Sequence, residues 1–193
     1  MVVFAYCIHS AGQEMHYLFF SGEINPQNVH RLINALAAIN AGPDHDVYLL
    51  MNSNGGNVVA GIQCYNLIQA LPINLTMHNL SNIDSIANVI FLAGDHRICS
   101  PNSTFMFHSV GFDQQGPIRL EERNLRQFLD SVVADNKRMG RIISARTNLS
   151  ERSAGALFRE QRTRDADWAL GHGFVHQIAD PQIPAGVQLQ QLV

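Results

Sequence analysis

Charged residues are scarce in this chain of 193 residues: Asp, Glu, Lys and Arg make up 15%, where a typical soluble domain has about a quarter. Hydrophobic residues reach 46%, so we expect part of the surface to be covered by something other than water. Either an oligomer or a large core would account for this composition. The 13 Lys and Arg residues form no basic block and the formal net charge is −3, which argues against a nucleic-acid-binding protein.

Cysteines and targeting signals are also few. Cys7, Cys64 and Cys99 are odd in number, lie among apolar residues and lack metal-ligand spacing, so we expect buried thiols in a reducing compartment and no metal site. The amino terminus resembles no secretory signal, and no apolar run approaches the roughly 20 residues that a membrane span requires. These absences predict a cytoplasmic protein without a membrane partner.

Strands and helices alternate along most of the chain, which predicts an α/β domain with a largely parallel sheet and helices on both sides. A single domain over residues 1–193 is expected, with a core at 1–116 and 148–180 and a loose tail at 181–193. The expected strands are at 2–9, 16–21, 46–51, 73–78, 97–99, 104–108 and 174–178. The expected helices are at 25–41, 57–71, 85–93, 148–158 and 165–171.

One segment, residues 117–147, stands out by its length. Apolar residues recur among charged ones and only Gly140 interrupts the pattern. This predicts a single helix of about 28 residues, roughly 40 Å long. Such a helix would overhang a domain of this size, so we expect it to pack against something outside its own core. Two helices broken near Gly140 are the alternative.

A glycine pair, Gly55 and Gly56, stands where the strand at 46–51 is followed by a helix. Glycines at such a point permit positive φ and the close approach of a ligand, and the free N–H groups of the following helix favour a developing negative charge. The simpler interpretation is a turn that needs a flexible backbone.

A serine and a histidine each adjoin an apolar segment. Ser85 precedes the apolar run Ile86–Gly94, where it either caps a helix or lies on a rigid elbow beside backbone amides. His108 ends an apolar strand, where a histidine is more often a surface residue than a base. Together, Ser85 and His108 supply the parts of a serine acyl-transfer site.

These blocks in register resemble the Clp protease proteolytic subunits. Residues 48–56 are similar to the strand and glycine loop of that family, and Ser85 falls at the position of its nucleophile. Residues 100–108 are similar to the Pro-Asn-Ser segment that leads to the catalytic histidine. The likeness covers about Tyr17 to Ile178, with residues 118–146 similar to the long handle helix that interleaves two rings.

The resemblance implies a ClpP/crotonase-like fold built from repeated β-β-α units, with a protruding handle helix. It also implies a homo-oligomer, as a heptameric ring or stacked rings around a chamber. Its substrate would be an unfolded polypeptide or peptide, with an ATPase unfoldase as a partner and no cofactor.

The chain departs from the family pattern at four places. Asp84 stands beside the nucleophile where small residues are usual, and Asn54 replaces a proline of the glycine loop. Gln161 occupies the position of the third triad residue, usually Asp. Few residues precede Tyr17, so the amino-terminal loops that engage an unfoldase are expected to be short or absent.

In the predicted mechanism of a serine endopeptidase, Ser85 attacks a peptide carbonyl and His108 transfers the proton. The backbone N–H groups of Gly56 and Ile86 form the oxyanion hole, and Gln161 orients His108. A neutral amide cannot stabilise an imidazolium as a carboxylate does, so slow turnover is expected. A shifted loop could instead supply a carboxylate from Glu160, Asp165 or Asp167.

The substrate is expected to lie as an extended peptide near Gly55 and Gly56, held by main-chain hydrogen bonds. Two alternatives remain open at this point. One is a catalytically silent ring subunit, which Asp84 and Gln161 favour. The other is a crotonase-type acyl-CoA enzyme, which would leave the pairing of Ser85 with His108 unexplained.

Overall fold

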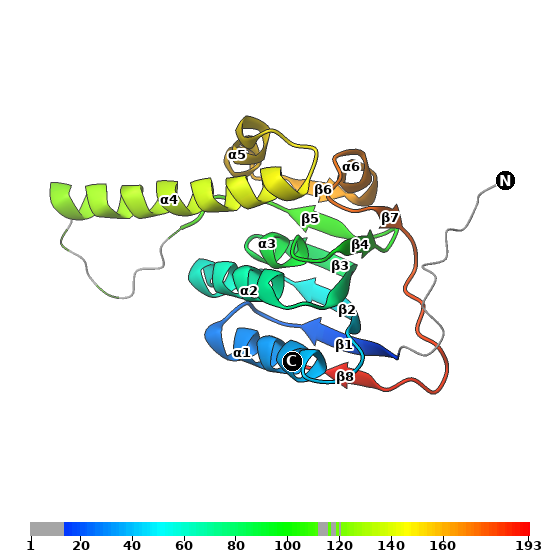
Figure 1. Ribbon diagram of the computed structural model, residues 1–193. Helices are drawn as coiled ribbons and strands as arrows, with labels where there is room; N and C mark the ends of the chain where they lie inside the picture. The colour runs from blue at the N-terminus through cyan, green and yellow to red at the C-terminus, as the bar shows by residue number, and fades with distance from the viewer. Residues whose placement is uncertain (1–13, 112–115, 117–118, 120) are drawn as a thin grey trace.

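A computed structural model describes residues 14–111, 116, 119 and 121–193 (Figure 1). The strand expected at 2–9, Cys7 and part of the segment before the long helix lie outside the described residues. None of the described helices is both long and apolar enough to cross a membrane.

The sheet is largely parallel, as predicted. Its main path runs β6-β5-β3-β2-β1-β8, and β4 pairs with both β3 and β7. Only the β5–β6 pair is antiparallel among the described strands. The strands are β1 (Met15–Ser21), β2 (Asp46–Ser53), β3 (Asn74–Asp84), β4 (His96–Cys99), β5 (Thr104–Met106), β6 (Thr163–Asp165), β7 (Gln177–Ile178) and β8 (Leu189–Gln191).

Strand β3 is longer than predicted; it pairs with β2 along one edge and with both β4 and β5 along the other. Its first half pairs with β4, from Thr76 to Asn79, and its last residues, Asn82 to Asp84, pair with β5. All of these strands run parallel. The carboxyl ends of β2, β3 and β5 therefore meet at one edge of the sheet, where parallel α/β sheets bind ligands.

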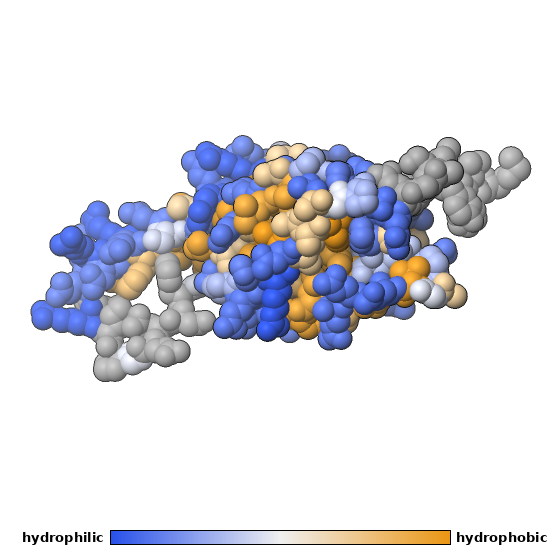
Figure 2. Space-filling model, turned by 60° about the horizontal axis from the view of Figure 1, so that its bottom comes forward, coloured by the Kyte–Doolittle hydropathy of each residue, from blue (hydrophilic) through white to orange (hydrophobic). Residues whose placement is uncertain are grey.

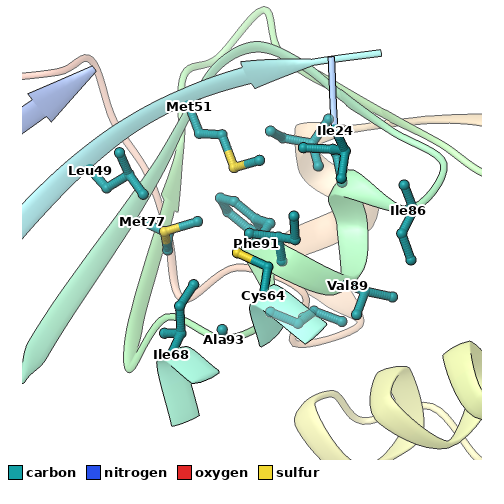
Figure 3. Close-up of a cluster of buried hydrophobic side chains, with 14 of the residues drawn as sticks. Ile24, Leu49, Met51, Cys64, Ile68, Met77, Ile86, Val89, Phe91 and Ala93 are labelled. Carbon is teal, nitrogen blue, oxygen red and sulfur yellow. The ribbon is translucent and has the colours of Figure 1, made fainter. Parts of the chain in front are cut away.

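Three helices lie side by side on the face of the sheet that is toward the viewer in Figure 1. They are α1 (Pro26–Asn40), α2 (Val58–Ala70) and α3 (Ala87–Phe91). Figure 3 shows the core between these layers: Leu49 and Met77 from the strands face Cys64 and Ile68 of α2 and Phe91 of α3. Burial raises the pKa of the Cys64 thiol to about 12, so this cysteine packs as an apolar residue, as predicted.

The long segment is one continuous helix, α4 (Glu122–Arg146), so the alternative of a break at Gly140 is wrong. Only its last part packs on the body, where Met139, Gly140 and Ile143 are buried. The remainder projects beyond the sheet (Figure 1). Two shorter helices follow, α5 (Glu151–Glu160) and α6 (Ala166–Gly171).

The tail at 181–193 is not loose throughout, which corrects the prediction. Strand β8 pairs in parallel with β1, and the Leu192 N–H donates to the Phe19 carbonyl at 2.9 Å. Strand β1 would otherwise present unpaired backbone groups at the sheet edge, and this pairing satisfies them. The side chain of Leu192 is buried against the core.

Arg97 fastens the end of α4 to the sheet. It is 4% exposed, and its guanidinium donates to the carbonyls of Phe174, Gly94, Gly173 and Arg146 at 2.8–3.2 Å. Burial lowers its pKa to about 10. The buried charge is therefore solvated by main-chain carbonyls from the turn before β4, the end of α4 and the segment before β7.

We expect Arg97→Met to lower the free energy of unfolding by about 3 kcal/mol, because buried carbonyls lose their donors. Arg126→Met is the matched control: Arg126 pairs with Glu122 one turn away and both side chains are more than three-quarters exposed, so about 0.5 kcal/mol is expected. Denaturant unfolding at one protein concentration measures both. Equal losses would show that the Arg97 contacts add nothing.

Candidate active site

Ser85 lies on a strained elbow between β3 and α3. Its φ is 56°, a left-handed conformation that a residue other than glycine adopts only when its surroundings enforce it. Here the Ser85 N–H donates to the Met106 carbonyl at 2.8 Å. The Asn88 side chain donates to the carbonyls of both Ser85 and Met106, at 3.0 and 2.8 Å.

Ser85 is not a helix cap. The cap position of α3 is taken by Ile86, without a side-chain capping hydrogen bond, so the structural explanation of this serine is wrong. The side chain of Ser85 is 7% exposed. A hydroxyl on a strained turn at the carboxyl edge of the sheet is the placement seen for nucleophiles on strand–turn–helix elbows.

The glycine loop after β2 lies directly against this elbow. A Cβ on Gly55 would come within 2.6 Å of the Ser85 Cβ, and a Cβ on Gly56 within 2.3 Å of the Ile24 carbonyl oxygen. Both glycines have positive φ, 90° and 144°. Only glycine therefore fits at either position. The predicted positive φ is confirmed at both glycines, and the close neighbour of Gly55 in this structure is Ser85.

Some backbone N–H groups of the elbow and the glycine loop donate hydrogen bonds within the protein, and others do not. The Gly55 N–H donates to the Ser53 hydroxyl at 3.2 Å, and the Asn57 N–H donates to the Ile24 carbonyl at 2.7 Å. In the described part of the chain, neither the Gly56 N–H nor the Ile86 N–H donates a hydrogen bond. Gly56 is exposed, whereas Ile86 is buried.

His108 follows β5 by two residues and is half-buried. Its Nδ1 lies 2.8 Å from the Ser109 carbonyl oxygen. A carbonyl only accepts, so Nδ1 carries the proton, and in the neutral ring Nε2 is then a free acceptor. Ser85 and His108 stand at the ends of neighbouring strands, but between these two described residues no hydrogen bond is formed.

The register of the β5–β6 pair, extended beyond Met106 and Thr163, assigns Gln161 to the position opposite His108. The Phe107 N–H donates to the Arg162 carbonyl at 3.2 Å, which extends this ladder and leaves Gln161 opposite His108 at the next position. Gln161 is exposed, ends α5 with a φ of 50°, and makes no side-chain hydrogen bond to any described residue. The structure brings Gln161 near the histidine by register only.

The carboxylates considered as substitutes for Gln161 are engaged elsewhere or exposed. Glu160 pairs with Arg164 at 2.6 Å, and Asp165 caps α6 by accepting from the Trp168 N–H at 2.8 Å. Asp167 is exposed. These contacts give no support to a shifted loop that carries one of the three to His108.

Hydrogen bonds that the sequence did not predict connect Asn54 and Asp84, two of the residues that depart from the family pattern. The Asn82 side-chain amide donates to the Asn54 side-chain oxygen at 2.8 Å and to the Asp84 carboxylate at 2.7 Å. Burial raises the pKa of Asp84, while Asn82, the Met106 backbone and the charge of His108 act to lower it. The Asp84 carboxylate, next to Ser85 in the chain, is therefore anchored at the glycine loop.

A model of the family described as Clp protease matches residues 5–182. The chain belongs to the Clp protease family. The recognition made from the glycine, serine and histidine blocks is thereby confirmed.

Among the Clp relatives, the ATP-dependent Clp protease proteolytic subunit 3 of Rhizobium etli is 23% identical, over 86% of this chain and 84% of its own length. The proteolytic subunit of Chlorella vulgaris is 28% identical, over 84% of this chain and 80% of that protein. The match to subunit 3 of Rhizobium johnstonii, at 26% identity, spans 66% of that relative, slightly less than two thirds.

A solved structure of a ClpP1 mutant from Listeria monocytogenes superposes with a TM-score of 0.75 at 19% identity, covering 86% of this chain and 92% of that one. At this identity the likeness bears on the fold alone, and it confirms the predicted ClpP-like α/β fold.

Sequence reasoning missed Asn82 and Asn88. Asn88 carries a signal in retrospect: it is a polar residue one turn after Ser85 within an apolar run, and it is 1% exposed. An asparagine buried among apolar neighbours requires hydrogen-bond partners, and here the partners hold the elbow.

The left-handed elbow predicts an unusual order of stabilities. Ser85→Gly relieves the backbone strain that Ser85→Ala retains. We therefore expect the free energy of unfolding of Ser85→Gly to exceed that of Ser85→Ala by about 1 kcal/mol. Denaturant melts of the two variants, with Ser109→Gly and Ser109→Ala as a control pair outside the elbow, measure the difference. If alanine were the more stable residue at 85, the elbow would not be strained.

Proposed function

We propose that this Clp family member is a serine endopeptidase in which Ser85 and His108 react. One observation carries the proposal: Ser85 is held in a left-handed conformation against Gly55, at the edge where the strand leading to His108 also ends. A strained hydroxyl, with a free imidazole nitrogen at the end of the neighbouring strand and unused backbone amides, supports an activated nucleophile once His108 moves into reach.

In the proposed reaction, Ser85 Oγ attacks the scissile carbonyl carbon while His108 Nε2 takes the hydroxyl proton. The carbonyl oxygen becomes an oxyanion, which accepts from the N–H groups of Gly56 and Ile86. His108 then protonates the leaving amine, and an acyl-enzyme remains on Ser85. Water, activated by the same imidazole, releases the acyl group and restores the serine.

The substrate on this proposal is an unfolded polypeptide or peptide, bound in extended form near Gly55 and Gly56. The curated relatives are named as ATP-dependent Clp proteases, which supports an ATPase unfoldase as a partner. Clp family membership also supports a cytoplasmic location. A crotonase-type reaction has no specific support now that the family is known.

We expect a fluorophosphonate probe to modify Ser85 covalently, detected by intact-protein mass and peptide mapping. Ser85→Ala should show no modification, and His108→Ala should be modified at least 100-fold more slowly, because the general base contributes about this much or more. Ser109→Ala is the control for an unrelated hydroxyl next to the histidine.

A wild-type protein that reacts no faster than Ser85→Ala would overturn the peptidase proposal. The silent ring subunit, which Gln161 and the missing contact between Ser85 and His108 favour, would then be the better account of this chain.

Assembly into a homo-oligomer is part of the same proposal, as a heptameric ring or stacked rings. Helix α4 exposes Leu125, Leu129 and Val133, spaced four residues apart and 52–62% exposed, and α2 exposes Val59 at 62%. Figure 2 shows a projecting arm with apolar atoms along part of its length and a broad apolar area on the body. A continuous apolar stripe on a helix that leaves its own core calls for a partner surface.

We expect Leu129→Glu to lower the mass measured by light scattering, because the substitution places a charge in the apolar stripe of α4. Ser131→Glu adds the same charge on a different side of the same exposed helix turn and should leave the mass unchanged. A monomeric wild type, or equal effects of the two variants, would contradict assembly through α4.

A further inference from the structure

The residue immediately before Ser85 carries an inference that rests on the proposed peptidase function. Asp84 is atypical for the family in both size and charge. Its carboxylate accepts from the Asn82 amide at 2.7 Å, and the same amide donates to Asn54 at 2.8 Å. The carboxylate is therefore held in one orientation from the glycine loop.

The sheet register places Asp84 and His108 on one face. Ile83 pairs with Phe105 and Asp84 with Met106. Phe105 and Phe107 are both 0% exposed, whereas Met106 and His108 are half-buried. Since side chains alternate along a strand, Asp84, Met106 and His108 share the face opposite the buried phenylalanines.

Burial raises the pKa of the Asp84 carboxyl, and the charge of His108 acts on it in the opposite direction. The two carboxylates on the β6 side are engaged elsewhere: Glu160 pairs with Arg164, and Asp165 caps α6. Gln161 is neutral. Two strands pair with β5, and each carries one carboxylate: Asp165 of β6 is committed to capping α6, whereas Asp84 of β3 also acts electrostatically on His108.

The group that fixes the tautomer of His108 differs from the group that would stabilise its protonated form. The Ser109 carbonyl accepts from Nδ1 and fixes the neutral tautomer that leaves Nε2 free to take a proton. A carbonyl carries no full charge, so it does little to stabilise the imidazolium that this transfer creates. A nearby carboxylate would supply that missing stabilisation.

We propose that Asp84 is a positioning residue that stabilises the protonated His108 and so replaces the third triad carboxylate that Gln161 lacks. Asp84 takes no proton in this role. The hydrogen bond from Asn82 holds the carboxylate in place. On this proposal, the departures from the family pattern at Asn54 and Asp84 compensate for the carboxylate that is missing at Gln161.

The test is the rate at which the fluorophosphonate probe modifies Ser85. Asp84→Asn keeps the size and the acceptor for Asn82 but removes the charge, so we expect the maximal labelling rate to fall about tenfold, an effect limited by the half-exposed setting, with the half-saturating probe concentration unchanged. Asp95→Asn is the matched control. Asp95 accepts from the Leu75 N–H at the opposite end of β3, and its variant should label like wild type.

A second-site rescue separates charge from packing. Gln161→Asp should speed labelling of Asp84→Asn by more than it speeds labelling of wild type, because each carboxylate does the same work. A purely structural role of Asp84 would give equal factors in both backgrounds. Should Asp84→Asn fold poorly, as judged by circular dichroism, the Asp84→Glu and Asp84→Gln pair repeats the comparison at equal size.

The outcomes distinguish the two proposals. If wild type is labelled and Asp84→Asn labels at the same rate, the role of Asp84 is refuted while the peptidase proposal stands. If wild type is not labelled above Ser85→Ala, the peptidase proposal fails and the role of Asp84 fails with it. Slower labelling of Asp84→Asn with preferential rescue supports both.

Discussion

The hydrogen bond from the Ser85 N–H to the Met106 carbonyl is the contact on which the site depends. It continues the β3–β5 pairing one residue beyond the strand, and so forces the chain to turn at Ser85 with positive φ. The same carbonyl accepts from Asn88, which ties the start of α3 to β5. One main-chain acceptor therefore holds Ser85, the following helix and the strand that leads to His108.

The glycine loop completes this arrangement from the other side. Gly55 packs directly on Ser85, and the loop is fastened to the body by the Ser53 hydroxyl, which donates to the Gly22 carbonyl at 2.7 Å. Rigid support from two neighbouring strands allows a strained residue to persist. The strain is local, and the large core between the sheet and its helices supplies the stability that offsets it.

Much of the fold was predictable because its elements carry strong local patterns. The strand at 46–51, the capped helix after Asn25 and the long amphipathic helix all appear close to the expected bounds. The extension of β3 to Asp84 was not predictable, since Asn79, Ser81 and Asn82 resemble turn residues. Their polar groups are satisfied by distant partners, as when the Asn79 side chain donates to the Thr104 carbonyl at 2.9 Å. The pairing of β8 with β1 likewise joins the two ends of the chain and has no local signal.

In the candidate site, too, some features follow from local sequence and others depend on distant partners. Ser85, His108 and the glycine pair follow directly from segments that end at one sheet edge. The relation between Asn54, Asn82 and Asp84 depends on a register between β2 and β3 that is irregular near Ser53, which no sequence pattern indicates. The interactions of Asn54 and Asp84, which differ from the family pattern, could therefore be identified only in the structure.

The most direct measurement of the central claim is a crystal or cryo-electron microscopy structure of the protein after reaction with a fluorophosphonate. The account predicts a phosphonyl group on Ser85 Oγ, with its free oxygen accepting from the Gly56 and Ile86 N–H groups and His108 Nε2 within hydrogen-bond reach. A modified Ser85 whose phosphonyl oxygen points away from both amides, with His108 still remote, would contradict it.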